Sequence, residues 1–123
     1  MTTPSLSRLA PCPRTPNCVS TLAPPGPKHM DPIPYTGSQA EARERLLRVL
    51  RAMERTVIVQ EEPDYLQAIC RSRVFRFPDK VEFAFDDAAK LIHFRSAARY
   101  GIRDFGVNRA RMERIRREFL GTS

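Results

Sequence analysis

The chain has 123 residues, a net charge of +7, 28% charged residues and 41% hydrophobic residues. These values are ordinary for one small globular domain. No stretch approaches the roughly 18 apolar residues that a membrane-spanning helix needs, so no membrane span is expected. The N-terminus also lacks the basic start and apolar core of a secretory signal, and we therefore expect a cytoplasmic protein.

Arginine carries most of the positive charge, because only three of the 21 basic residues are lysines. Phosphate contacts by basic side chains supply most non-specific affinity for nucleic acids. Here, however, the charge is spread along the sequence and is interrupted by an acidic stretch at residues 57–70. Nucleic-acid binding is therefore disfavoured.

Residues 1–37 hold nine of the eleven prolines. Proline at this density disrupts the interior of both helices and sheets. We expect residues 1–37 to form an extended, Pro-rich N-terminal arm, followed by a single α+β domain at residues 38–121. Within the arm, residues 32–35 are the segment most suited to docking, because Ile33 and Tyr35 offer apolar side chains to bury.

A helix is predicted directly after the arm. Ser38 and Glu41 have the spacing of a capping box, in which each side chain accepts a hydrogen bond from the other residue's backbone amide. Leu46, Leu50 and Met53 then recur at helical spacing, which extends the predicted helix to about residue 55.

Four or five strands follow the first predicted helix. Residues 56–60 and 64–71 have strand character, and residues 75–77 either extend the second strand or form a short strand of their own. Residues 81–85 and 92–96 alternate between apolar and polar side chains on either side of a turn, which is typical of a hairpin. A last helix is predicted from Asn108, which is expected to cap it, to about Phe119.

This order of elements favours an α+β fold. Each helix has one apolar stripe, and an antiparallel sheet can leave one face polar. The expected architecture is a two-layer sandwich, with an antiparallel sheet of four to five strands and two helices on one face.

The sequence resembles a family of small bacterial and plastid proteins grouped as domain of unknown function 1499. The residues that carry the resemblance are Cys12-Pro13, Pro16 to Ser20, Asp64 to Leu66, Arg71 to Phe77, Asp79, Val81 to Phe83, Arg95 to Ala97 and Gly106 to Arg109. The resemblance covers nearly the whole chain, and it implies no activity because the family is named for having none established. It also implies that Cys70 fills a core position that is apolar in the family.

The second face of the sheet, which points away from the helices, carries the candidate ligand-binding residues. They are Tyr65, Arg71, Glu82, His93 and Arg95. A carboxylate, an imidazole, a phenol and two guanidinium groups on one face can hold an anionic ligand through bidentate contacts, with the arm or the loop at 99–106 as a roof. The alternative is a plain polar surface, in which cross-strand Glu–Arg pairs are common.

A second polar group lies near predicted strand and helix ends. It consists of Asp79, Asp104, Asn108 and Arg109, for which we expect structural roles, including an ion pair between Asp79 and Arg109. Acid–base catalysis needs two groups whose environments push their pKa values apart, and no spacing here establishes such a pair.

Cys12 and Cys18 lie six residues apart in the arm. They can close a disulfide in an oxidising compartment, and in a cytosol they would stay thiols. A metal site would need further ligands that the sequence does not supply, so no metal is expected. No phosphate-binding or dinucleotide motif is present, and no cofactor is expected.

The sequence leaves three functions open, and it does not decide whether the protein is an enzyme. The first is a non-enzymatic binding or interaction module for an anionic small molecule or an acidic protein partner. The second is a cofactor-free enzyme that uses Glu82 or Asp79 as acid–base and Arg71 or Arg95 as an oxyanion clamp. The third is weak RNA binding by the arginines of the last helix, which we otherwise expect to form a solvated basic surface.

Overall fold

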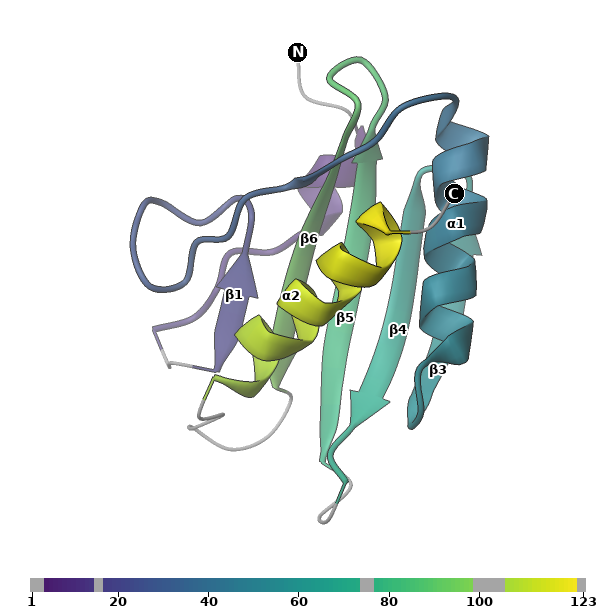
Figure 1. Ribbon diagram of the computed structural model, residues 1–123. Helices are drawn as coiled ribbons and strands as arrows, with labels where there is room; N and C mark the ends of the chain where they lie inside the picture. The colour runs from purple at the N-terminus through teal and green to yellow at the C-terminus, as the bar shows by residue number, and fades with distance from the viewer. Residues whose placement is uncertain (1–3, 15–16, 74–76, 99–105, 122–123) are drawn as a thin grey trace.

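A computed structural model describes residues 4–14, 17–73, 77–98 and 106–121 (Figure 1). In chain order the elements are the 3-10 helix η1 (Pro4–Arg8), β1 (Cys18–Ser20), β2 (Ile33–Pro34), α1 (Gln39–Ala52), β3 (Thr56–Glu62), β4 (Tyr65–Arg71), β5 (Pro78–Asp86), β6 (Leu91–Ala98) and α2 (Val107–Leu120). The possible strand at 75–77 falls mostly outside the described residues.

The strands form one antiparallel sheet in the order β1-β6-β5-β4-β3, and β2 also pairs with β6. Both helices cover one face of this sheet, so the predicted α+β architecture is confirmed (Figure 1). The sheet has six strands rather than four to five. The two additional strands come from the arm, where β1 contains no proline and Pro34 of β2 lies on the edge of the sheet, where proline is tolerated.

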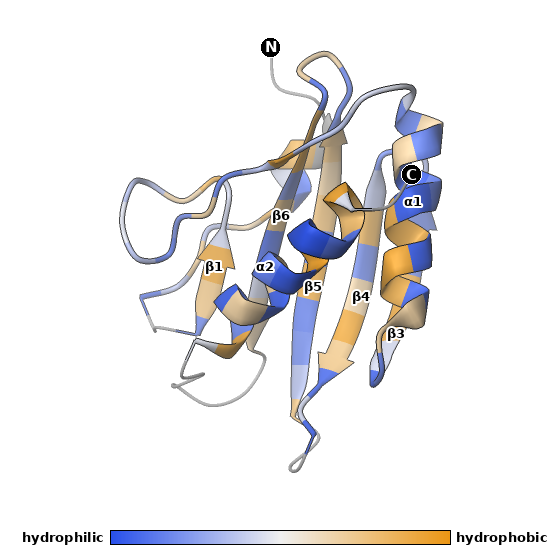
Figure 2. Cartoon of the chain, viewed as in Figure 1, coloured by the Kyte–Doolittle hydropathy of each residue, from blue (hydrophilic) through white to orange (hydrophobic). Residues whose placement is uncertain are grey.

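The core lies between the helices and the sheet. Phe83 and Phe94 are directly opposite each other on β5 and β6, and both side chains are fully buried. Leu50 of α1 and Phe119 of α2 reach the same cluster from the helical layer. In Figure 2, orange and blue bands follow one another along β4 and β5, and the side of α2 that faces the viewer, away from the sheet, is mostly blue.

The two helices begin in different ways. The capping box at α1 is confirmed, because Ser38 accepts from the Glu41 amide at 3.1 Å while the Glu41 carboxylate accepts from the Ser38 amide at 3.0 Å. The predicted cap of α2 is wrong: Gly106 holds that position, with φ of 80°, a conformation that glycine adopts without strain. Asn108 lies within the first turn and is fully buried.

The arm is part of the folded structure rather than a loose extension. Ile33 and Tyr35 are buried in the core, as predicted for residues 32–35. The Tyr35 hydroxyl also donates to Asp87 in the β5–β6 turn at 2.7 Å. At the other end of the arm, η1 lies behind the sheet in Figure 1, on the second face.

Candidate functional site

The strand register brings four of the five predicted ligand-binding residues together on the second face. Glu82 is directly opposite Arg95, and in the next row Ala84 lies between Tyr65 and His93. Arg71 is opposite Pro78, four residues along β5 from Glu82. At about 3.4 Å per residue, Arg71 is roughly 14 Å from the row of Glu82 and Arg95 and roughly 20 Å from the row of Tyr65 and His93. The register therefore keeps the two predicted guanidinium groups apart.

Glu82 is the centre of the group. Its carboxylate is almost completely buried and accepts a hydrogen bond from the Tyr65 hydroxyl at 2.5 Å. Arg95 and Lys80 approach the other carboxylate oxygen at 3.7 and 3.8 Å. We call Tyr65, Lys80, Glu82 and Arg95 the Glu82 cluster. One carboxylate faces two cations, so the cluster carries a net charge of +1.

Tyr65 acts as a fixed donor to this carboxylate. Burial, followed by the hydrogen bond to Glu82, raises the pKa of the Tyr65 phenol well above its ordinary value. The phenol therefore stays protonated at neutral pH, and it orients one oxygen of Glu82.

Arg95 is the least satisfied member of the cluster. Its Nη1 atom faces Glu82 at 3.7 Å, a distance too long for a good hydrogen bond. Its Nη2 atom reaches the Pro11 carbonyl at 3.5 Å, the outer limit for a hydrogen bond. Its buried Nε atom has no hydrogen-bond partner among the described residues. Nε and Nη2 form the edge of a guanidinium that binds a carboxylate side-on with two parallel bonds, and this edge is poorly used.

His93 is held beside this group by the arm. The Thr21 hydroxyl lies 2.9 Å from His93 Nδ1 and accepts from the Phe94 amide at 3.1 Å. The one proton of the hydroxyl can point to Nδ1 or to the Phe94 carbonyl at 3.5 Å, and the shorter contact favours donation to an unprotonated Nδ1. Burial lowers the pKa of His93, which also favours the neutral imidazole.

The second face is covered by the arm over this region. Leu6 and Leu9 form a small apolar cluster with Tyr65 and Ala84. The Arg8 guanidinium stacks over the Tyr65 ring at 3.8 Å. The arm thus supplies the roof that the sequence allowed for, while residues 99–105 of the other candidate roof fall outside the described residues.

The second predicted group forms a buried polar network instead of an open site. Arg111 donates to Asp79 at 2.7 Å and to Asn108 at 2.8 Å, and Ser96 donates to Asn108 at 2.6 Å. Asn108 in turn donates to the Asn17 carbonyl at 3.1 Å. The network joins β5, β6, α2 and the arm, which supports a structural role for Asp79 and Asn108.

The predicted ion pair between Asp79 and Arg109 is wrong, because Asp79 pairs with Arg111. Arg109 instead donates to the backbone carbonyls of Pro27 and His29 in the arm, at 2.6 and 3.0 Å. Arg109 and Arg111 both lie on α2, and side chains two residues apart on a helix point to different sides of it. Asp104 lies outside the described residues.

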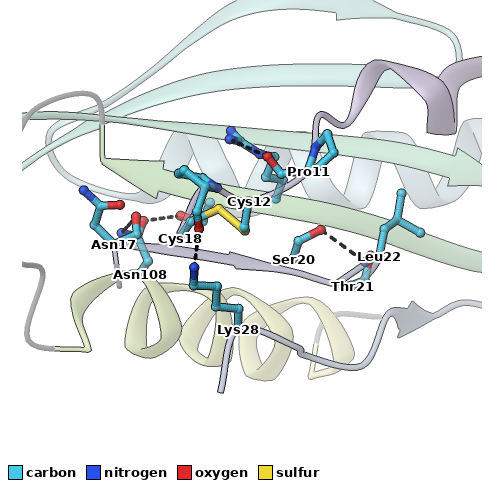
Figure 3. Close-up of a disulfide and its surroundings, with 12 residues drawn as sticks. Pro11, Cys12, Asn17, Cys18, Ser20, Thr21, Leu22, Lys28 and Asn108 are labelled. Atoms are coloured by element: carbon cyan, nitrogen blue, oxygen red, sulfur yellow. Dashed lines mark hydrogen bonds between the residues drawn. A yellow bond between two sulfur atoms is a disulfide. The ribbon is translucent and has the colours of Figure 1, made fainter. Parts of the chain in front are cut away.

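Cys12 and Cys18 form a disulfide, with Cα atoms 5.7 Å apart (Figure 3). The bond ties the segment that carries Pro11 to β1, and Cys18 lies directly opposite Ala97 of β6. Cys70 is buried in the core, as the resemblance implied, and it forms no disulfide. Figure 3 also shows Lys28 reaching the arm segment next to the disulfide, where its ammonium donates to the Pro13 carbonyl.

Sequence reasoning missed three contributors to this site. Lys80 could have been found from the sequence, because it lies two residues from Glu82 on β5 and residues two apart on a strand point to the same face. The roles of Thr21 and of the Pro11 carbonyl had no sequence signal, because they depend on how the arm folds back over the sheet.

Within the described ranges, no group of three or more His, Cys, Asp or Glu side chains is arranged to hold a metal ion. None of the helices described is long and apolar enough to cross a membrane. The family model for proteins of unknown function DUF1499 matches residues 8–119 of the chain. A search of curated proteins gives no match.

Proposed function

Because the chain belongs to the DUF1499 family of proteins of unknown function, the family assigns it no activity, and we propose a function from the geometry of its own residues. The protein is a non-enzymatic binding module for a small anionic molecule, held by Arg95 on the second face of the sheet. The arm covers the bound molecule and shields it from water.

The observation that carries this proposal is the poorly used edge of Arg95, where the buried Nε has no partner among the described residues. Buried polar groups in native proteins nearly always have hydrogen-bond partners, so an unpartnered guanidinium nitrogen calls for an explanation. A carboxylate or phosphate group would supply two acceptors to Nε and Nη2 at once. The net positive charge of the Glu82 cluster favours such an anion over a cation.

Native mass spectrometry of the full chain tests the proposal, beside a denatured control. We expect a reproducible extra mass that disappears on denaturation. The same mass should be retained by Arg48→Lys, a change on the exposed side of α1, and lost by Arg95→Lys, which keeps the charge but not the planar pair of donors. A bare wild-type protein, or an extra mass that Arg95→Lys retains, would contradict the proposal.

A cofactor-free enzyme is the second candidate, and one observation favours it. Glu82 is a buried carboxylate with an oriented phenol on one oxygen and a guanidinium beside the other. Asp79 is less suited to acid–base chemistry because Arg111 already holds it. Glu82→Gln would abolish turnover in an enzyme, whereas in a binding module it would only change affinity.

RNA binding is supported least. Of the five arginines on α2, four donate to other parts of the chain: Arg109 and Arg116 to arm carbonyls, Arg111 to Asp79, and Arg114 to Glu118 and Glu54. An acidic protein partner would need an accessible basic surface, whereas Arg95 is largely covered. A small molecule therefore suits the site better than either macromolecule.

The cytoplasmic location expected from the sequence remains a proposal. The bond between Cys12 and Cys18 favours an oxidising compartment instead, because cytosolic thiols are normally kept reduced. Trapping the thiols by rapid alkylation in intact cells would distinguish the two, since only reduced cysteines are modified.

A further inference from the structure

The arm forms one apolar cavity, partly open to solvent, of about 450 Å³ next to the disulfide. Its walls are mainly proline and leucine side chains, and its residues include Leu9, Pro11, Arg14, Leu22, Pro24 and Lys28. Two of these are cationic and none is acidic. A volume of this size is in the range of small-molecule sites.

The cavity comes close to Arg95 through two of its lining residues, although Arg95 itself does not line it. Pro11 lines the cavity, and its carbonyl is the atom that Arg95 Nη2 approaches at 3.5 Å. Ser20 also lines it and lies directly opposite Arg95 in the β1–β6 pair. Directly paired residues of an antiparallel ladder point to the same face, so the guanidinium lies on the same side of the sheet as the cavity. Figure 3 shows Pro11, Cys12, Ser20 and Lys28 around this part of the arm.

We propose that this cavity binds a carboxylic acid with an apolar tail, the tail lying against the proline and leucine walls and the carboxylate held side-on by Nε and Nη2 of Arg95. The inference rests on the proposed function and names the chemical class of the anion. Two features of the site select this class together. Placing a hydrocarbon tail against the apolar walls removes apolar surface from water, which lowers the free energy of binding. The poorly used guanidinium edge matches the planar geometry of a carboxylate.

Binding requires a small movement of the arm. Arg95 Nε is buried, and the Pro11 carbonyl stands over the adjacent Nη2. The carboxylate replaces this carbonyl, whose contact at 3.5 Å is weak, and the loss of that contact costs little. Pro11 therefore acts as the part of the wall that yields, while the disulfide keeps the segment attached to β1.

Isothermal titration calorimetry on the full chain tests this inference with three probes. Octanoate has both the carboxylate and the tail, octanamide has the tail with a neutral head, and acetate has the carboxylate alone. We expect octanoate to bind, octanamide to bind at least about tenfold more weakly because it lacks charge-assisted bonds, and acetate at least about 100-fold more weakly because it lacks six methylene groups.

Two variants separate the head from the tail. Arg95→Lys should weaken octanoate binding by about tenfold or more and leave octanamide unchanged. Leu22→Asn changes a cavity wall whose side chain is 45% exposed, so the fold should tolerate it, and it should weaken octanoate and octanamide alike. Leu120→Asn, at an apolar residue 52% exposed on α2, is the matched control and should change neither.

The outcomes distinguish the inference from the proposed function. One outcome would be that acetate and octanoate bind equally, that both depend on Arg95 and that Leu22→Asn has no effect. In that case the proposed anion site stands and the apolar-tail inference is overturned. If octanoate and octanamide bind equally and Arg95→Lys changes nothing, both are overturned, because the anion is not what is recognised. Absence of binding by all three probes also overturns the inference.

Discussion

Arg111 of α2 and Asp79 of β5 form an ion pair at 2.7 Å, with each side chain only 10% exposed. The pair joins the last helix to the centre of the sheet, on the face opposite the Glu82 cluster. Arg111 also donates to Asn108 and to Ser96, so its guanidinium is well satisfied, in contrast to that of Arg95. Arg111 therefore has the contacts of a structural residue, whereas Arg95 is the residue for which we propose a binding role.

We expect Arg111→Ala to lower the free energy of unfolding by about 3 kcal/mol, because it leaves the buried carboxylate of Asp79 without its partner. Urea denaturation of the variant and the wild type measures this change. Arg117→Ala, at an exposed position of the same helix, should change the free energy of unfolding by less than about 0.5 kcal/mol. Equal effects of the two substitutions would show that the buried ion pair contributes no more to the free energy of unfolding than an exposed arginine does.

Deletion of residues 1–30 should greatly destabilise the protein. The deletion removes buried apolar side chains on both faces of the sheet, including Leu6, Leu9 and Val19, and it takes β1 away from β6. Each buried side chain of this size contributes about 1.5–3 kcal/mol, so their sum approaches the whole stability of a small domain. We expect the melting temperature to fall by more than about 10 °C, or the cooperative transition to disappear.

Two single substitutions in the arm serve as controls for the deletion. Leu9→Ala removes a buried side chain and should cost about 2 kcal/mol, whereas Leu22→Ala changes an exposed one and should cost less than about 0.5 kcal/mol. An unchanged melting temperature in the truncated protein would mean that the rest of the chain, from residue 31 onward, folds without the first 30 residues of the arm.

Much of the fold followed from the sequence because its signals are local. The capping box at Ser38 and the alternation around Phe83 and Phe94 each depend on neighbouring residues, and both were confirmed. The arm was harder to predict, because β1 and β2 exist only through pairing with β6, more than 50 residues later in the chain. Its prolines argued against sheet structure, but they did not prevent two short edge strands.

The candidate site could be predicted only in part for the same reason. Period-two alternation places Tyr65, Glu82, His93 and Arg95 on one face, but it does not set their register. The register keeps Arg71 away from them, and the arm, one of the two roofs that the sequence allowed for, covers part of this face. The unsatisfied edge of Arg95 is a property of three-dimensional packing, and no sequence pattern indicates it.

The stability of the protein should decrease as the pH falls below about 6.5, the ordinary pKa of histidine. Burial lowers the pKa of His93, so the folded state takes up its proton at a lower pH than the unfolded state does. The contribution of the neutral imidazole is therefore present above about pH 6.5 and is lost as the pH falls through the folded-state pKa.

Thermal melting of the wild type and of His93→Asn between pH 7.5 and 5 measures this effect. The Asn side chain offers Thr21 an acceptor in place of Nδ1 and does not titrate, so the pH dependence should become weaker in the variant. The same series on His29→Gln tests whether any remaining dependence belongs to the other histidine. A pH dependence in His93→Asn identical to that of the wild type would contradict the assignment.

Removal of the Cys12–Cys18 bond should lower the free energy of unfolding by about 2 kcal/mol, the value expected for a closed loop of this length. The double substitution Cys12→Ser, Cys18→Ser and treatment of the wild type with a dithiol reductant should have the same effect. The reductant should leave the double variant unchanged, even though Cys70 keeps its thiol in both proteins. Because the bond holds the segment that carries Pro11 against β1, its loss should also expose Arg95 to solvent. A double variant as stable as the wild type would mean that the arm is fixed by its packing and its contacts with α2, and that the compartment's redox state has no influence on the fold.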